Sequence, residues 1–322
     1  MGAITDNRLE YILNKLLITG VHGFVGSNLV YKFQHLYSIY GLDIIKQTKP
    51  GVIETFLWDD FSNLPLSDTI IHLAGKAHDL KKTSSESSYF DINYGLTVKI
   101  YDYFLKSDSK TFVFFSSVKA IADTVNEPLS ENILPNPITA YGKSKLKAEQ
   151  YILDNLPSNK TVIILRPCMI HGPGNKGNLN LLYDIVSKGI PWPLGAYNNS
   201  RSFLSIDNLC FVINAILESK LSTGIYNVAD DEPVSTNDLV KMISIVNKKK
   251  ERIWNIPKGI IETIAKVGNF LPLPLNEERL QKLTEHYIVS NKKIVEALSC
   301  SLPLTATEGL KKTFNYFNSS DK

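Results

Sequence analysis

The chain has 322 residues, which at roughly 150 residues per domain allows two domains, or one large α/β domain with a smaller lobe. Hydrophobic residues make up 43% and charged residues 21%, so a disordered or fibrous chain is excluded. Because 35 Lys+Arg against 32 Asp+Glu leave a net charge of only +3, and the one dense basic run (248–252) is short, nucleic acid is not an expected partner.

Short apolar runs alternate with helix-length segments through the first half of the chain. Strands are predicted at 15–20, 38–43, 53–58, 69–75, 111–117 and 161–167, and helices at 24–36, 86–105 and 140–153. The last of these helices has Lys and Glu at its predicted outer positions. Continuous apolar strands separated by helices indicate a parallel sheet covered on both faces. The expected fold is therefore α/β, with a doubly wound parallel sheet.

The composition changes after Pro167, where Gly, Pro and Asn crowd into 171–178 and 189–200. Such segments are typical of long functional loops. A strand end and a helix are predicted at 204–217, and another strand and turn at 224–232. The tail from Ser235 is mostly helical in pattern, with loop breaks at Pro272 and Pro274. The sequence thus predicts a smaller, mainly C-terminal lobe.

The cysteines and the N-terminal segment indicate the cellular context. The sequence has three cysteines, Cys168, Cys210 and Cys300, with no C-x-x-C or metal-ligand spacing among them. An odd number of unpaired cysteines is typical of a protein in the reducing cytosol. Residues 1–14 lack the positive start and apolar stretch of a signal peptide, and no run approaches ~18 uninterrupted apolar residues. We expect a cytoplasmic protein without a membrane span and without a bound metal.

A glycine turn follows the first predicted strand. Gly20, Gly23 and Gly26 form G-x-x-G-x-x-G at the point where the first predicted helix opens. This pattern provides a tight turn, a close backbone approach to a pyrophosphate, and helix N–H groups that face the anion. Asp43 ends the second predicted strand, where it would bind the adenosine ribose and favour NAD over NADP. The alternative for Asp43 is a solvated loop acid.

Three further residues form a candidate catalytic set. Tyr141 and Lys145 are four residues apart on one face of a predicted helix. A phenol with a pKa near ~10 is a poor base at neutral pH, and a nearby ammonium would stabilise its phenolate. Ser117 ends a predicted strand, where its hydroxyl can hydrogen-bond a reacting oxygen. Because Tyr and Lys at this spacing are common on solvated helix faces, the assignment depends on Ser117 and the glycine turn.

These motifs resemble those of a known family. In chain order they are the glycine turn, Asp43, HLAGKAH (72–78), Asn93, FFSS (114–117), Tyr141 with Lys145, LRP (165–167) and RSFLSIDNL (201–209). Together they look like the extended short-chain dehydrogenase/reductase family and, within it, the NAD-dependent epimerase/dehydratase group that acts on nucleotide-activated sugars. The resemblance runs from about Lys15 to Phe317.

The resemblance implies a Rossmann NAD-binding domain at 15–167, to which 203–229 returns, and a nucleotide-sugar-binding lobe at 168–202 and 230–322, usually in a homodimer. It implies that the pyrophosphate lies on Gly20, Gly23, Phe24, Val25 and Gly26, the ribose on Asp43, and the adenine edge on Asp59 or Asp60. It further implies that Leu73, Ala74, Gly75 and Lys76 run beside the cofactor, with Asn93 and Ser116 nearby and Pro167 next to the nicotinamide. On the substrate side, Asn178 and Leu179 match the segment that holds the nucleotide, and Arg201 matches an arginine that clamps the sugar diphosphate.

The residues after Ser117 bear on the reaction. Dehydratases of this group carry an Asp-Glu pair there, whereas this chain has Val118 and Lys119, which disfavours elimination. Two hydride-transfer reactions remain, a nucleotide-sugar 4-epimerase and an NAD(P)H-dependent 4-keto sugar reductase, and Asp43 favours the epimerase. A non-catalytic NAD-binding sensor is a remote third alternative. Lys119 is interpreted either as a substrate contact or as a solvated loop lysine.

The sequence indicates the identity of the sugar less clearly than the reaction, because residues 120–122 and Met169 depart from the better-known epimerase pattern. SSVK, RPCMIHGPGNKGN and PWPLGAYNNSRS are similar instead to a bacterial branch found in O-antigen and capsule sugar pathways. This similarity predicts a UDP-sugar substrate, a UDP-hexose or UDP-N-acetylhexosamine for the epimerase. For the reductase it predicts a UDP-4-keto-6-deoxy-N-acetylhexose.

Overall fold

The computed structural model describes residues 13–320 apart from 77–84, 126, 176, 220 and 272–274. The predicted loop breaks at Pro272 and Pro274 lie outside the described residues, as do residues 77 and 78 of the HLAGKAH motif and nearly all of the N-terminal segment 1–14.

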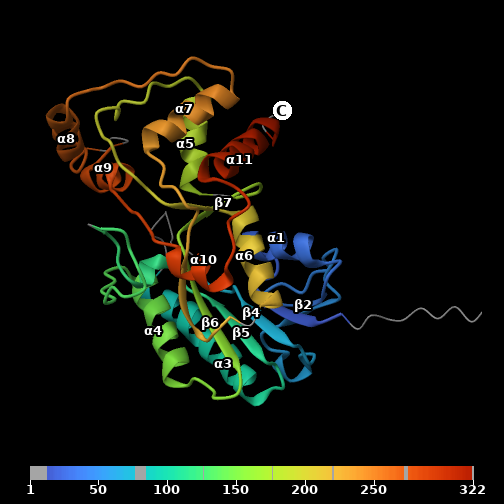
Figure 1. Cartoon of the computed structure of the whole chain (residues 1–322). Coiled ribbons are helices and arrows are strands. Elements are labelled where there is room, and N and C mark those ends of the chain that lie inside the picture. The colour runs from blue at the N-terminus through green and yellow to red at the C-terminus, as the bar shows by residue number, and fades with distance from the viewer. Residues whose placement is uncertain are drawn as a thin grey trace, which may run out of the picture.

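Seven parallel strands form the central sheet, in the order β3-β2-β1-β4-β5-β6-β9 (Figure 1). They are β1 Lys15–Thr19, β2 Ser38–Asp43, β3 Glu54–Leu57, β4 Thr69–His72, β5 Thr111–Phe115, β6 Thr161–Pro167 and β9 Gly224–Val228. The strands are short and nearly continuously apolar because both faces of the sheet are covered. The strand order reverses beside β1, which pairs with both β2 and β4. This Rossmann-like sheet confirms the predicted fold class.

Two helical layers cover the sheet (Figure 1). On one face lie α1 Phe24–Phe33 and α6 Ile206–Glu218, and on the other lie α3 Leu96–Lys106 and α4 Ala140–Asp154. Successive residues of each strand point to opposite faces of the sheet. In β1, Leu16 and Ile18 pack in the core beneath α1 and α6, and Leu17 packs in the core beneath α3 and α4. The sheet is thus fixed from both sides, and the carboxyl ends of its strands are held in place to form a site.

The predicted helix at 86–105 is divided into three parts. It consists of α2 Glu86–Tyr89, the π-helix η2 Phe90–Gly95 and α3. Tyr94 and Val98, which a regular helical period aligns with the fully buried Tyr101, are only half-buried, whereas Asn93 and Thr97 are fully buried. The wider π turn rotates the helix face, which explains why a regular 3.6-residue period misplaces it.

A smaller lobe follows β6. It contains β7 Met169–His171 paired with β8 Phe203–Ser205, and α5 Asn178–Ser187, α7 Thr236–Val246, α8 Lys258–Val267, α9 Glu277–Thr284 and α11 Ala306–Ser320. Tyr183, Phe203 and Phe314 are buried in its own core. The helix α10 Lys292–Leu298 instead packs against β9, and Ile294 joins the core of the sheet. The domain boundaries themselves stay a prediction.

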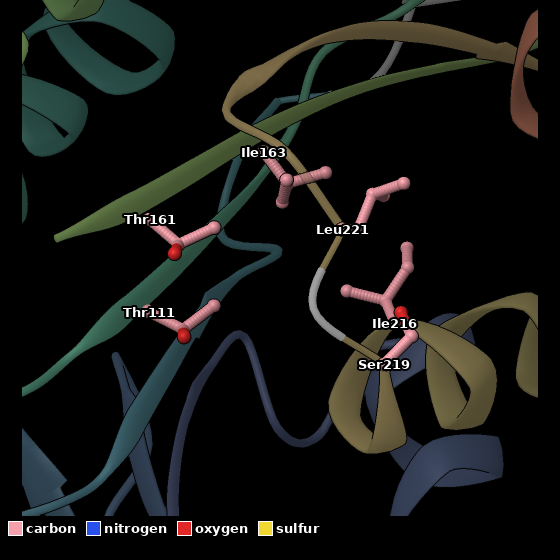
Figure 2. Close-up of a pocket in the computed structure, with 6 residues that line it drawn as sticks. All are labelled: Thr111, Thr161, Ile163, Ile216, Ser219 and Leu221. Carbon is pink, nitrogen blue, oxygen red and sulfur yellow. The ribbon is translucent and has the colours of Figure 1, made fainter. Parts of the chain in front are cut away.

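A hollow of about 270 Å³ lies at the amino ends of β5 and β6. Figure 2 shows Thr111 and Thr161 side by side on these strands, facing Ile216 and Ser219 at the end of α6. None of its lining residues carries a titratable side chain, and it lies at the opposite end of the strands from Ser117 and Pro167. It is therefore unsuited to catalysis. Within the described part of the chain, no helix is long and apolar enough to cross a bilayer.

Candidate active site

The glycine turn joins β1 to α1 in a conformation that requires glycine. Gly20 has φ +70°, and a Cβ there would lie 3.0 Å from the backbone of Ala74. A Cβ on Gly26 would lie 2.8 Å from the Cα of Val21. Because Gly23 occupies the N-cap of α1, no side chain covers the first N–H groups of the helix. The turn is therefore open to an anion.

Asp43, at the carboxyl end of β2, is held beside this turn. Its carboxylate accepts hydrogen bonds from the backbone N–H of His22 (2.9 Å) and of Ile44 (2.7 Å), and the residue is only 8% exposed. It is therefore a fixed group and not a solvated loop acid. The two candidates for the adenine edge follow β3, the strand next to β2: Asp59 is exposed, and Asp60 accepts a hydrogen bond from Asn63.

The segment after β4 runs from the glycine turn to the catalytic helix. The N–H of Ala74 donates to Thr19 Oγ1 (3.0 Å), and the N–H of Lys76 donates to Asn93 Oδ1 (2.7 Å). Asn93, which the π-helix turns inward, donates in turn to the carbonyl of Lys76 and to Ser144 Oγ of α4. A Cβ on Gly75 would lie 3.1 Å from Lys145 Nζ, so the backbone passes directly beside that ammonium. Leu73 is half-buried in the same segment.

Ser117, Tyr141 and Lys145 come together where β5 ends and α4 begins. The hydroxyl groups of Tyr141 and Ser117 are hydrogen-bonded. Burial raises the pKa of Tyr141 above its usual value, and the bond to Ser117 acts in the opposite direction. Lys145 Nζ donates to the carbonyl of Phe115 (2.8 Å). Burial lowers the pKa of Lys145 to about 8, although Glu149 opposes the shift.

A buried ion pair beneath this set was missed by the sequence analysis. Glu149 was expected at an outer position of α4, but it is 0% exposed and pairs through both carboxylate oxygens with Arg166 of β6. Ser116 also donates to Glu149, so its hydroxyl points into this pair. A buried carboxylate needs such partners. The available signal was the spacing of Tyr141, Lys145 and Glu149, which places all three on one helix face.

The first turn of α4 is docked onto the loop that carries Ser117. Thr139 caps the helix, and its N–H and hydroxyl, with the N–H of Ile138, donate to the carboxylate of Asp123. A Cβ on Gly142 would lie 2.3 Å from the carbonyl oxygen of Lys119, so glycine allows this close contact. Asp123, Thr139 and Gly142 therefore fix Tyr141 relative to Ser117, and the sequence analysis had singled out none of them.

Pro167, which was predicted next to the nicotinamide, ends β6 beside Val228 of β9. The residues predicted to bind the nucleotide, Asn178 and Leu179, lie in the smaller lobe at the start of α5. Leu179 is 4% exposed, and its side chain packs in the core of the lobe, so only its backbone is available to a nucleotide. Asn178 begins α5, and its side chain lies outside the described residues.

Two predicted cations lie at the seam between the sheet and the lobe. Arg201 donates to the carbonyl of Lys282 (3.0 Å) and lies 3.9 Å from the carboxylate of Glu285. Lys119 Nζ donates to the carbonyl of Asp123 (2.8 Å) and lies 4.0 Å from the ring centre of Tyr287. Lys119 is thus tied to the seam and is not a freely solvated loop lysine.

The residues present fit a dinucleotide. The glycine turn leaves room that any Cβ would fill, the start of α1 offers N–H groups, and Asp43 offers carboxylate oxygens at the adjoining strand end. Among the described residues, no group of three or more His, Cys, Asp or Glu could hold a metal ion.

Fold and site together are typical of a dinucleotide-dependent enzyme. Residues 16–229 match the NAD dependent epimerase/dehydratase family. The chain belongs to this family, which confirms the predicted class of enzyme and its cofactor.

The sequence is similar to those of individual relatives over nearly the whole chain. The sequence is 31% identical to a UDP-glucose 4-epimerase of Vibrio cholerae, across 94% of this chain and 95% of that protein. It is 26% identical to an N-acetyl-alpha-D-glucosaminyl-diphospho-ditrans,octacis-undecaprenol 4-epimerase of Escherichia coli O157:H7, with the same coverage. The fold is similar to that of a UDP-glucuronic acid 4-epimerase from Bacillus cereus in complex with NAD (TM-score 0.73, 20% identity, covering 96% of this chain and 100% of that one).

Proposed function

We propose that the protein is an NAD-dependent 4-epimerase of a UDP-linked hexose or N-acetylhexosamine, and that it acts as a homodimer. The observation that carries the proposal is the hydrogen bond between Tyr141 and Ser117 at the mouth of a dinucleotide site. No acidic side chain directly follows Ser117, so the chain lacks the acid pair expected of an elimination at that position. Relatives over nearly the full length that are named as 4-epimerases support the proposal.

The chain's own groups have distinct tasks in this reaction. When bound, NAD would supply the acceptor for the C4 hydride and the donor for its return to the opposite face of the sugar, which inverts C4. Tyr141 takes the proton of the C4 hydroxyl as the carbonyl forms and gives it back when the alcohol is restored. Ser117 donates to the same sugar oxygen and keeps it within reach of Tyr141. Lys145, one helical turn after Tyr141, would favour the phenolate electrostatically when its own side chain carries a charge.

Binding of the sugar nucleotide requires a cation for the diphosphate. Arg201 has a planar guanidinium that is fixed through Lys282 and Glu285, and we assign the diphosphate to it. We assign the nucleotide to the backbone of Asn178 and Leu179. Lys119, held on the same seam, is assigned to the sugar.

The test is to purify the protein, release its cofactor by denaturation, and separately incubate the native enzyme with UDP-GlcNAc and UDP-Glc without added NAD(H). Bound NAD together with a C4-inverted product by NMR would support the epimerase. If cofactor-free protein inverts nothing but consumes NADH or NADPH with a UDP-4-keto-6-deoxy-N-acetylhexose, the reductase replaces it. Because one relative is named for a polyprenyl-diphosphate sugar, undecaprenyl-diphosphate-GlcNAc belongs in the same assay.

A further inference from the structure

Four charged side chains gather where the loop after β5 meets the C-terminal lobe. The loop contributes Lys119, and the lobe contributes Arg201, Lys282 and Glu285. Glu285 Oε1 lies 3.9 Å from the guanidinium of Arg201, and its carboxylate is within electrostatic reach of Lys119 and Lys282 as well. We call these four residues the seam cluster. Lys282 and Glu285 are the two members that were not predicted from the sequence.

The seam cluster adjoins the catalytic set on one side. Lys119 is two residues beyond Ser117, and its backbone N–H donates to Ser117 Oγ (3.2 Å). Tyr287, two residues beyond Glu285, donates through its hydroxyl to the carbonyl of Ala122 (2.7 Å) and lies under the Lys119 ammonium. The segment that carries Glu285 is therefore held against the loop that carries Ser117.

On its other side the seam cluster reaches the end of β6. Arg201 lies near Cys168, the residue directly after Pro167: burial raises the pKa of this thiol, and the Arg201 guanidinium opposes that shift. The cluster thus bridges the two strand-end loops, after β5 and after β6, that flank the place where we put the reacting sugar. A sugar substituent at this place would meet Glu285.

The charges of the seam cluster and its neighbours balance. Glu285 lies among Lys119, Arg201 and Lys282. Lys282 is also paired with Glu278 (2.9 Å), and the carboxylate of Asp123 is within electrostatic reach of Lys119. The side chains of Glu285 and Arg201 are only 14% and 22% exposed, so solvent screens their charges weakly. Burial raises the pKa of Glu285, and its three cationic neighbours oppose that shift. Each cation of the seam cluster therefore has a carboxylate neighbour, and a second carboxylate, brought by the sugar, would meet that of Glu285.

We propose that Glu285 is a specificity-determining residue that lets this site accept hexoses with neutral substituents and reject hexuronic acids. The proposal rests on the proposed function, because it assumes that a nucleotide-linked sugar lies between the strand-end loops. Like charges that face each other in a poorly screened site discriminate strongly between partners. Without the Glu285 charge, Lys119 would be available to pair with a sugar carboxylate.

The experiment compares UDP-glucose with UDP-glucuronate in the NAD-loaded wild type and in Glu285→Gln, which keeps the shape of the side chain. We expect kcat/KM for the uronate to rise relative to that for glucose by about tenfold or more. Because Glu285 also lies 3.9 Å from Arg201, a change in the affinity for UDP itself affects both substrates and cancels in this ratio. Glu278→Gln is the matched control, because Glu278 pairs with Lys282 from an exposed position in the same lobe. Its substrate ratio should equal that of the wild type.

An unchanged ratio in Glu285→Gln, or an equal loss with both substrates, would overturn the proposal and leave Glu285 a structural residue. Dissociation constants of the two UDP-sugars, measured by calorimetry, separate this proposal from the proposed function. Selective binding that Glu285→Gln relaxes, without any epimerisation, would support the role of Glu285 and refute the epimerase. Wild-type protein that binds or converts UDP-glucuronate as well as UDP-glucose would overturn the role of Glu285 even if the epimerase is active.

Discussion

Replacing Gly142 with Ala tests whether the docking of α4 sets the distance between Tyr141 and Ser117. The new Cβ would lie 2.3 Å from the Lys119 carbonyl oxygen and 2.8 Å from Pro137 Cβ. Restoring an ordinary contact near 3.4 Å requires the first turn of α4 to move by about 1 Å away from the loop that carries Ser117. A displacement of about 1 Å in a catalytic geometry can reduce the rate by about 10²-fold.

The overpacking should also lower the free energy of unfolding by about 1–3 kcal/mol. The assay is kcat with the preferred UDP-sugar, together with urea denaturation and NAD affinity. Gly259→Ala is the control, since Gly259 also lies in the first turn of a helix and a Cβ there would meet no atom within 4 Å. This control should retain wild-type kcat. A Gly142→Ala enzyme with wild-type kcat would refute the argument that this contact positions Tyr141.

Three further predictions concern the groups around Tyr141. Ser117→Ala should lower kcat by about 10²-fold. Ser116→Ala should instead leave kcat within a few-fold and destabilise the protein by about 1–3 kcal/mol, because the buried Glu149 loses a donor. Steady-state kinetics and denaturation of both variants distinguish the two roles. Arg166→Met should cost about 3–5 kcal/mol in urea denaturation, because it leaves the carboxylate of Glu149 buried without its cation, and a loss under 1 kcal/mol would contradict this interpretation. Lys145 has a pKa of about 8 in the folded protein, below the value of 10.5 for an exposed lysine, so the folded state releases this proton first as the pH rises. Wild-type stability relative to that of Lys145→Met should therefore increase between pH 8 and 10, and a constant difference in denaturation free energy across that window would count against a buried ammonium.

The parts of the site that depend on local sequence could be predicted. The glycine turn is specified by three residues within seven positions, and Asp43 by its place at the end of an apolar strand. Tyr141 and Lys145 follow from helix spacing. Each of these features requires only short-range geometry and the parallel order of the strands.

The remaining parts depend on contacts between distant segments or on an irregular backbone. Asn93 reaches Ser144 only because a π turn rotates the helix, and no regular period encodes that rotation. Glu149 looks like a solvated helix residue until Arg166, on a strand, is placed beneath it. Glu285 and Lys119 are separated by more than half of the chain, so their interaction becomes visible only after the lobe is folded onto the sheet.

The most direct test of the central claim follows the hydrogen at C4. A UDP-sugar that carries deuterium at C4 would be incubated in ordinary water with wild-type enzyme and with Tyr141→Phe, and the product would be examined by NMR and mass spectrometry. Hydride transfer and return within one site predict a C4-inverted product that keeps its deuterium with the wild type, and little product with Tyr141→Phe. An inverted product that has lost its deuterium to solvent would contradict the account.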